Sequence, residues 1–150
     1  MGVNTSQTAF EPQAAPDVRT TFDSHQGDYQ PGACNIGPAE IARRRRAGQV
    51  GIGGAAALAV ALLVLDAPTA ARWLVALPLT VGAVGFLQAR FRFCAAYGMA
   101  GVRNFGALGS VERVDDAATR RADRAKSIGI FTASAAIGVG GALVLVALPR

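Results

Sequence analysis

The chain has 150 residues, of which 51% are hydrophobic and only 17% are charged, and its formal net charge is +5. Because a soluble domain carries about a quarter charged residues, this composition excludes an ordinary soluble enzyme and indicates a membrane protein. The charge is unevenly distributed: residues 1–33 hold one arginine and four acidic residues, so the positive charge lies in the remainder. Such asymmetry is typical of a chain that meets a membrane or another anionic partner.

Residues 1–33 are rich in Gln, Ser, Thr, Pro and Gly and contain few large apolar side chains. A segment of this composition buries too little apolar surface to offset its conformational entropy. We therefore predict a disordered, acidic, cytoplasmic tail. It contains the only histidine, His25, so we expect no histidine-based metal site, and no other cofactor is predicted.

Three windows without a charged side chain follow, at residues 47–65, 73–89 and 127–149. Each is close to the ~20 residues with which a helix crosses a hydrocarbon core about 30 Å thick. The windows are apolar or small on every face, as in helices surrounded by lipid and by each other. The sequence therefore predicts an all-α membrane protein with a transmembrane helical hairpin, a third transmembrane helix and the N-terminal tail.

The first membrane helix is expected to begin at Pro38. Gly37 can occupy the N-cap position, and Pro38 the first helical position, where its missing N–H costs nothing. Glu40 then lies in the first turn, where the helix dipole favours a negative charge. It can also pair with Arg44, four residues later on the same face.

A tight turn is expected between the first two helices, with Asp66 and Pro68 ending the first and Trp73 anchoring the second at the interface. Pro78 lies inside the second helix and should bend it. Small residues at three- or four-residue spacing would let the helices approach closely, although Gly and Ala are common throughout the chain. They are Gly51, Ala55 and Ala59, then Gly82, Gly85 and Ala89, and finally Ser134, Gly138 and Ala142.

Residues 103–126 form a polar, cytoplasmic connection that we expect to be partly helical. Residues 110–126 fit a helix with Ser110 as its N-cap and Glu112 in the first turn. Its arginines could hold the helix on the anionic inner leaflet. A solvated linker helix is the interpretation we favour, because the apolar side is built mostly of alanine. The third membrane helix would then be separate, at residues 127–149.

Basic residues near the helix ends gather on one side of the predicted bundle, while the other side has only Arg72 and Arg150. The positive-inside rule predicts that the basic side is cytoplasmic, with the N-terminus inside and the C-terminus outside a bacterial inner membrane. The arginines beside the first two helices should set this topology and contact anionic lipid headgroups rather than nucleic acid. They are Arg43, Arg44, Arg45, Arg46, Arg90 and Arg92.

Two motifs lie at hairpin spacing within residues 34–102. The first consists of Asn35, Gly37, Glu40, Arg44 and Gly48, and the second of Phe93, Cys94, Tyr97, Gly101 and Val102. Together they resemble the YgaP-like inner-membrane transmembrane domain, a bacterial two-helix family. Ile41, Arg92 and Ala95 depart from its pattern, because they stand where the family has Arg, Gly and Pro. The resemblance implies a two-helix hairpin over residues 34–102 and little about activity.

The two cysteines leave two interpretations open. Cys34 precedes the first helix and Cys94 follows the second, so an up-and-down hairpin brings both to the cytoplasmic interface. We favour small apolar side chains kept reduced by the cytosol. The alternative is a reactive thiol pair, or a reactive Cys94 whose thiolate is stabilised by Arg90 and Arg92, with Arg90 four residues earlier on the same helix face.

These features favour a non-catalytic accessory, scaffold or membrane-organising protein, in a larger membrane complex or a homo-oligomer. The chain has no phosphate-binding loop, paired-carboxylate site or nucleophile triad that stands out, so we do not expect an enzyme. The alternative is a thiol-dependent protein that handles sulfur or redox equivalents through Cys94, with or without Cys34. A transporter or channel ranks last, because the three windows lack ionisable groups.

Overall fold

The computed structural model describes residues 29–148. The tail predicted for residues 1–33 therefore lies outside the described residues as far as residue 28. Residues 29–33 are described and form a turn in which the N–H groups of Ala33 and Cys34 both donate to the carbonyl of Gln30, each at 2.9 Å. Residues 29–33 are thus ordered, whereas the sequence assigned them to the disordered tail.

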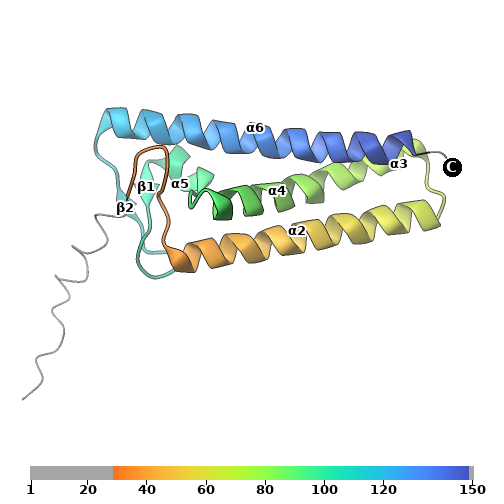
Figure 1. The fold of residues 1–150 in the computed structure, drawn as a ribbon, viewed down its shortest axis with the longest axis horizontal. Coiled ribbons are helices and arrows are strands. Elements are labelled where there is room, and N and C mark those ends of the chain that lie inside the picture. The colour runs from red at the N-terminus through yellow and green to blue at the C-terminus, as the bar shows by residue number, and fades with distance from the viewer. Residues whose placement is uncertain (1–28, 149–150) are drawn as a thin grey trace, which may run out of the picture.

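Three helical spans make up most of the fold. The first is α2, Pro38–Val64; the second consists of α3, Thr69–Arg72, the 3-10 turn η1, Trp73–Val75, and α4, Ala76–Arg90; the third is α6, Ala117–Ala147. Each span is long and apolar enough to cross a membrane. Figure 1 shows the three spans extending along the long axis of the molecule. The prediction of an all-α membrane protein with three membrane helices is confirmed.

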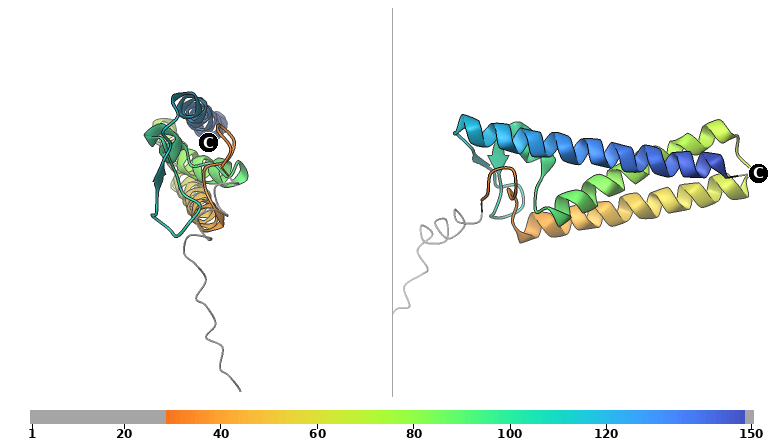
Figure 2. Two further views of the ribbon diagram at one scale, coloured as in Figure 1. Left: turned by 90° about the vertical axis from the view of Figure 1, so that its left-hand side faces the viewer. Right: turned by 45° about the horizontal axis from the view of Figure 1, so that its top comes forward.

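The smaller elements lie together at the end of the molecule where the chain enters α2. They are α5, Ala95–Ala100, and the antiparallel pair β1, Val102–Arg103, and β2, Glu112–Arg113. Helix α4 packs against both α2 and α6, and α5 packs against α6. Helix α4 therefore occupies the middle of the bundle, and the end-on left view of Figure 2 shows it, in green, between α6 in blue and α2 in orange.

Small residues form the contacts between the helices, as their spacing predicted. Gly48, Gly51 and Ala55 are buried on α2, and Gly82, Gly85 and Ala89 on α4. On α6 the buried residues include Ser134, Gly138 and Ala142. A methyl group added to Gly82 would meet the backbone nitrogen of Ile52 at 2.8 Å, so the first two spans touch backbone to backbone. Ala59 is half-buried beside them.

The ends of the first two spans agree with the sequence. Gly37 is the N-cap of α2 and Pro38 follows at the first helical position, while the helix ends before Asp66, whose φ is 48°. In the second span the backbone is 3-10 at Trp73–Val75, which ends three residues before Pro78. Proline offers no N–H to the carbonyl four residues earlier, which is that of Leu74, so the helical geometry changes where a bend was expected.

The third span differs from the prediction. Helix α6 is continuous from Ala117 to Ala147, so the cytoplasmic helix and the third membrane helix are one element. Ser110 is not its N-cap; Asp116 is, and the Asp116 carboxylate accepts from the Thr119 N–H at 2.6 Å. At about 1.5 Å per residue, 31 residues extend to roughly 46 Å, longer than a ~30 Å hydrocarbon core. The charged first turns therefore project beyond the apolar part.

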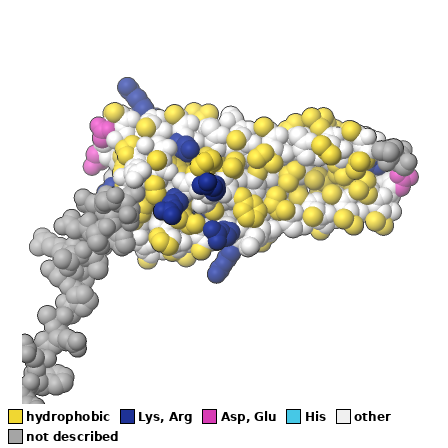
Figure 3. Space-filling model, in the orientation of Figure 1, with side chains coloured by type: hydrophobic (Ala, Val, Ile, Leu, Met, Phe, Trp, Pro, Cys, Tyr) yellow, Lys and Arg dark blue, Asp and Glu magenta, His cyan; other side chains and the backbone are white. Residues whose placement is uncertain are grey.

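The surface is divided along the long axis. Large apolar side chains are exposed along all three spans, among them Val60, Val64, Leu77, Val81, Leu143 and Val144. Figure 3 shows Lys and Arg side chains gathered over one half and hydrophobic ones covering the other. We call the first part the basic end; it comprises residues 29–46, 90–126 and the turns that they form. The apolar remainder is what helices exposed to lipid require.

Candidate functional site

Asn35 joins the two sequence motifs in the basic end. Its side-chain oxygen accepts from the Cys94 N–H at 2.7 Å, and its side-chain nitrogen donates to the Cys94 carbonyl at 3.1 Å. Its backbone N–H donates to the Arg92 carbonyl at 3.2 Å, and its carbonyl accepts from the Asn104 N–H at 3.0 Å. Asn35 is fully buried, so this one side chain ties the start of α2 to the turn after α4.

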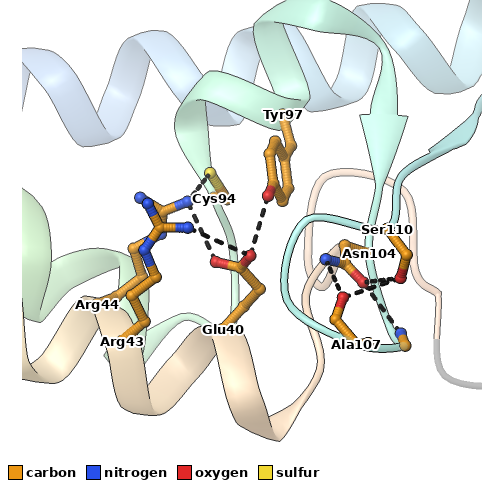
Figure 4. Close-up of polar contacts among 9 residues, drawn as sticks. Glu40, Arg43, Arg44, Cys94, Tyr97, Asn104, Ala107 and Ser110 are labelled. Carbon is orange, nitrogen blue, oxygen red and sulfur yellow. Dashed lines mark hydrogen bonds and ion pairs between the residues drawn. The ribbon is translucent and has the colours of Figure 1, made fainter.

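A second polar group lies beside it, which we call the Glu40 cluster: Glu40, Arg44, Cys94 and Tyr97 (Figure 4). The Tyr97 hydroxyl donates to Glu40 Oε1 at 3.0 Å, and Arg44 Nη2 lies 3.3 Å from Glu40 Oε2. The same Arg44 nitrogen donates to the Cys94 sulfur at 3.1 Å. Glu40 is only 1% exposed, so its charge depends on the arginine for compensation.

Burial raises the pKa of two groups of the cluster, Cys94 and Tyr97. It raises the pKa of the Cys94 thiol above its ordinary value, although the Arg44 guanidinium and nearby backbone N–H groups act in the opposite direction. Burial, followed by the hydrogen bond to Glu40, also raises the pKa of the Tyr97 hydroxyl. Because the thiolate is the nucleophilic form of cysteine, a raised pKa disfavours nucleophilic chemistry at Cys94.

The arginines expected beside Cys94 are not the ones that contact it. Helix α4 ends at Arg90, and Cys94 is already the N-cap of α5, so Arg90 and Cys94 do not share a helix face. Arg44, from α2, the other helix of the hairpin, is the residue that contacts the sulfur. The only sequence signal for this contact was the four-residue spacing of Glu40 and Arg44. It places both side chains on one face of α2, and in the structure this face meets Cys94 and Tyr97 of the second motif.

Cys34 lies in different surroundings. It lines a groove on the basic end, where its sulfur is 4.0 Å from the Ile36 carbonyl oxygen. Cys34 and Cys94 are not joined by a disulfide. Cys94 is fully buried and is not among the residues that line the groove, so the structure does not present the two thiols as a pair.

The remaining motif residues have packing roles. The Gly37 N–H donates to the Asn104 carbonyl at 2.8 Å, Gly48 lies against Phe86, and Phe93 is fully buried. Gly101 has φ 69° and ends α5. A left-handed backbone of this kind is adopted by glycine without steric cost.

Two buried polar residues had no sequence signal. Asn104 accepts from the Gly106 N–H at 3.0 Å and donates to the Ala107 carbonyl at 3.0 Å, which closes the loop after β1. Asp123, on α6, accepts from the Tyr29 hydroxyl and from the Gly32 N–H, both at 2.7 Å. Asp123 looked like one more charge in a polar helix, and its partners lie more than ninety residues away in the chain.

The predicted headgroup arginines divide into two sets. Arg44 is half-buried and belongs to the Glu40 cluster, whereas the other five are exposed: Arg43, Arg45, Arg46, Arg90 and Arg92. Arg43 lies 3.8 Å from Glu40. Within residues 29–148 no group of three His, Cys, Asp or Glu side chains is arranged to hold a metal ion.

Three apolar spans and a basic end define a multi-pass membrane protein. Comparison of the chain with protein-family models, with curated proteins and with solved structures gave no match. The YgaP-like resemblance therefore stays a prediction from the two motifs, whose residues the fold brings into contact through Asn35 and Arg44.

Proposed function

We propose that the chain is a non-catalytic, multi-pass protein of the bacterial cytoplasmic membrane that serves as an accessory or scaffold subunit of a larger assembly. Its basic end would lie in the cytoplasm, with the N-terminus on the same side. The three spans would hold this end at the membrane surface, where it can contact other proteins.

One observation carries the non-catalytic part of the proposal. The buried polar side chains of the basic end are engaged with one another: Glu40 with Arg44 and Tyr97, and Asn35 with both polar groups of the Cys94 backbone. These contacts join the start of α2 to the segment after α4, although Glu40 Oε2 and Arg44 Nε have no hydrogen-bond partner. They leave Cys94 fully buried, with a raised pKa that disfavours its thiolate.

The distribution of charge supports this orientation. The basic residues of α2, of the α4–α5 turn and of the first turns of α6 lie at one end of the bundle. Arg72 is the charged residue at the other end of the second span, and it is buried against the end of α6. An excess of Lys and Arg in short loops favours the cytoplasmic side.

Reporter fusions test the orientation. Alkaline phosphatase fused after Arg150 should be active, and a fluorescent protein at the same position should be dark, because that end would lie outside the cytoplasm. The opposite pattern would overturn the orientation.

Purification at native expression level tests the scaffold role. A tagged chain extracted in mild detergent should migrate as a complex with a stoichiometric partner or with further copies of itself. The Cys94→Ser variant should give the same complex, since no thiol chemistry is needed. A monomer without partners in both samples would contradict the proposal.

The thiol-dependent alternative rests on the Arg44 guanidinium, whose Nη2 is 3.1 Å from the Cys94 sulfur. A cation so close favours the thiolate, although burial acts against it. Rapid alkylation of Cys94 in native membranes at neutral pH, faster than that of Cys34, would favour this alternative over the scaffold. We expect the reverse order.

A further inference from the structure

A groove of about 1000 Å³ opens on the basic end. Its walls are the start of α2, the turn that follows α4, the loop residue Phe105 and the turn at residues 30–34. Pockets that hold small ligands usually measure about 300–1,000 Å³. The groove is therefore large enough for a headgroup together with part of an acyl chain.

The charge of the groove is of one sign. Arg45, Arg90 and Arg92 contribute to its lining, and among residues 29–148 no Asp or Glu does. None of the three forms an ion pair with a described residue, since the ion pairs of this region belong to Arg43, Arg44 and Arg103. Three uncompensated guanidinium groups around one hollow favour a phosphate, to which arginine can bind with two parallel hydrogen bonds.

The rest of the lining is mostly apolar: Ala33, Ile36, Pro38, Ile41, Ala42, Ala89, Phe91 and Phe105. A small inorganic anion would use only the arginines and would leave the exposed apolar residues of this lining, such as Pro38, Ala42 and Phe91, in water. A ligand that matches both parts carries a negative charge next to a hydrocarbon chain.

Backbone geometry adds to the case for Arg92. Its φ is 51°, in the left-handed region where glycine is less strained than a residue with a side chain. The turn alone would accept glycine here. Unusual backbone at a residue with an exposed charged side chain points to a use for that side chain.

The groove also lies at the level that a headgroup occupies. Arg90 is the last residue of α4 and the uncharged part of α2 begins just after Arg46, so the arginines stand where the apolar surface ends. Basic pockets between membrane helices on the cytoplasmic side are typical sites for anionic headgroups.

We propose that this groove binds one anionic phospholipid, with its phosphate on Arg45, Arg90 and Arg92 and the start of an acyl chain on Ile41 and Phe91. The inference rests on the proposed function in one respect, because the basic end must face a leaflet that contains anionic lipid.

Native mass spectrometry of the full chain in mild detergent tests the site. Titration with phosphatidylglycerol should give one retained lipid per chain, and phosphatidylcholine should be retained at least about fivefold less well. Arg45→Gln and Arg92→Gly should each weaken phosphatidylglycerol binding by about fivefold or more, as expected for the loss of a charge-assisted contact. Arg92→Gly also relieves the left-handed backbone, so lost binding in this variant cannot be ascribed to misfolding.

Arg113→Gln is the control, because Arg113 is an exposed arginine of the basic end that does not line the groove. It should bind phosphatidylglycerol within about twofold of the parent chain, an effect below that of a lost phosphate contact. Equal weakening by Arg113→Gln and Arg45→Gln would show general charge attraction and overturn the site, as would equal retention of the two lipids.

Alkylation of Cys34, which lines the groove, separates the possible occupants. Phosphatidylglycerol should slow its alkylation, and inorganic phosphate at the same concentration should not; equal protection by phosphate would overturn the lipid assignment. The chain's own N-terminal segment is the third possible occupant, and its acidic residues are Glu11, Asp17, Asp23 and Asp28. If neutralising these four residues made the alkylation of Cys34 faster in lipid-free detergent, this segment would be the occupant, and the lipid assignment would be overturned. These measurements are made in detergent and do not depend on the orientation in a membrane. Lipid binding can therefore fail while the reporter fusions support the orientation, and the orientation can fail while lipid binding is observed.

Discussion

Gly51 of α2 and Gly82 of α4 touch through their backbones: a methyl group added to Gly51 would lie 2.5 Å from the Gly82 nitrogen. No side chain separates the two helices at this point. In lipid, where water does not drive helices together, such close approach provides much of the association energy. The contact between these two residues therefore sets the distance between the first two spans.

Replacing Gly51 by leucine should separate the helices and destabilise the protein. Overpacking of a tight contact costs about 1–3 kcal/mol, and the displaced atoms here are backbone, which cannot move aside. Gly54→Leu is the control, because nothing lies within 4 Å of a methyl group at Gly54. Thermal unfolding in detergent should show a lower transition temperature for Gly51→Leu only. Equal transition temperatures for the two variants would contradict the packing argument.

Asn35→Ala should be among the most destabilising polar substitutions at the basic end. It leaves the Cys94 N–H and carbonyl buried without their partners, and each buried polar group left unsatisfied costs about 1–3 kcal/mol. Gln49→Ala, on the exposed side of α2, should have little effect. Chemical unfolding in detergent measures the difference, and similar unfolding midpoints for the two variants would count against the role of Asn35.

Arg72 should hold the end of α6 in place. Its Nη1 donates to the carbonyls of Leu145 and Leu148, at 3.2 and 2.8 Å, which are among the carbonyls that a helix end leaves without partners. Arg72→Met keeps much of the side-chain volume and removes these bonds. Hydrogen exchange in the last turn of α6 should rise by about tenfold or more, as expected for at least 1.4 kcal/mol of lost local stability. Unchanged exchange in that turn would refute the role.

Stability should fall as the pH rises past about 8.5, the ordinary pKa of a thiol. Burial raises the pKa of Cys94 in the folded chain, so the unfolded chain loses its thiol proton at a lower pH than the folded chain does. The contribution of the protonated thiol to the free energy of unfolding is therefore complete below the unfolded pKa and is lost as the pH rises to the folded pKa. The slope of stability against pH between about 8 and 9.5, below most tyrosine ionisation, should be reduced in Cys94→Ala. Cys34→Ala should keep it, and an unchanged slope in Cys94→Ala would contradict this origin.

Helix packing could be predicted from the sequence because it depends on local periodicity. The spacing of Gly51 and Ala55, or of Gly138 and Ala142, places each pair on one helix face whatever the rest of the chain does, and all four residues are buried. The start of α2 could be predicted for the same reason. Gly37 and Pro38 mark a helix start within a few residues of sequence.

The start of α6 could not be predicted, because it depends on a contact distant in the sequence. Ser110 and Asp116 are both good N-cap residues, but Glu112 and Arg113 pair with β1, which keeps the chain extended until Asp116. The charges at residues 117–126 then indicated a boundary that the helix does not have. A helical backbone continues through a membrane surface as long as its own hydrogen bonds continue.

The candidate site was predicted in part. Both motifs were identified, but the contact of Arg44 with Cys94 requires the two spans to be placed side by side. Arg92 stands where the resembled family has glycine, and its φ of 51° gives a physical reason for glycine at such a position. Asp123 gave no signal, because its partners, Tyr29 and Gly32, lie in a segment that composition assigned to the tail.

Asp123→Ala should release the turn before α2 without unfolding the spans. The substitution leaves the Tyr29 hydroxyl and the Gly32 N–H without an acceptor, and both bonds measure 2.7 Å in the intact chain. Loss of a charge-assisted hydrogen bond costs about 1.5–3 kcal/mol, which is enough to open a short surface turn. Hydrogen exchange at Gly32 should therefore accelerate at least about tenfold, while exchange in α2 and α4 stays unchanged. Asp115→Ala is the control, because Asp115 is exposed; equal acceleration in both variants would show that overall charge, and not the Asp123 contact, holds the turn.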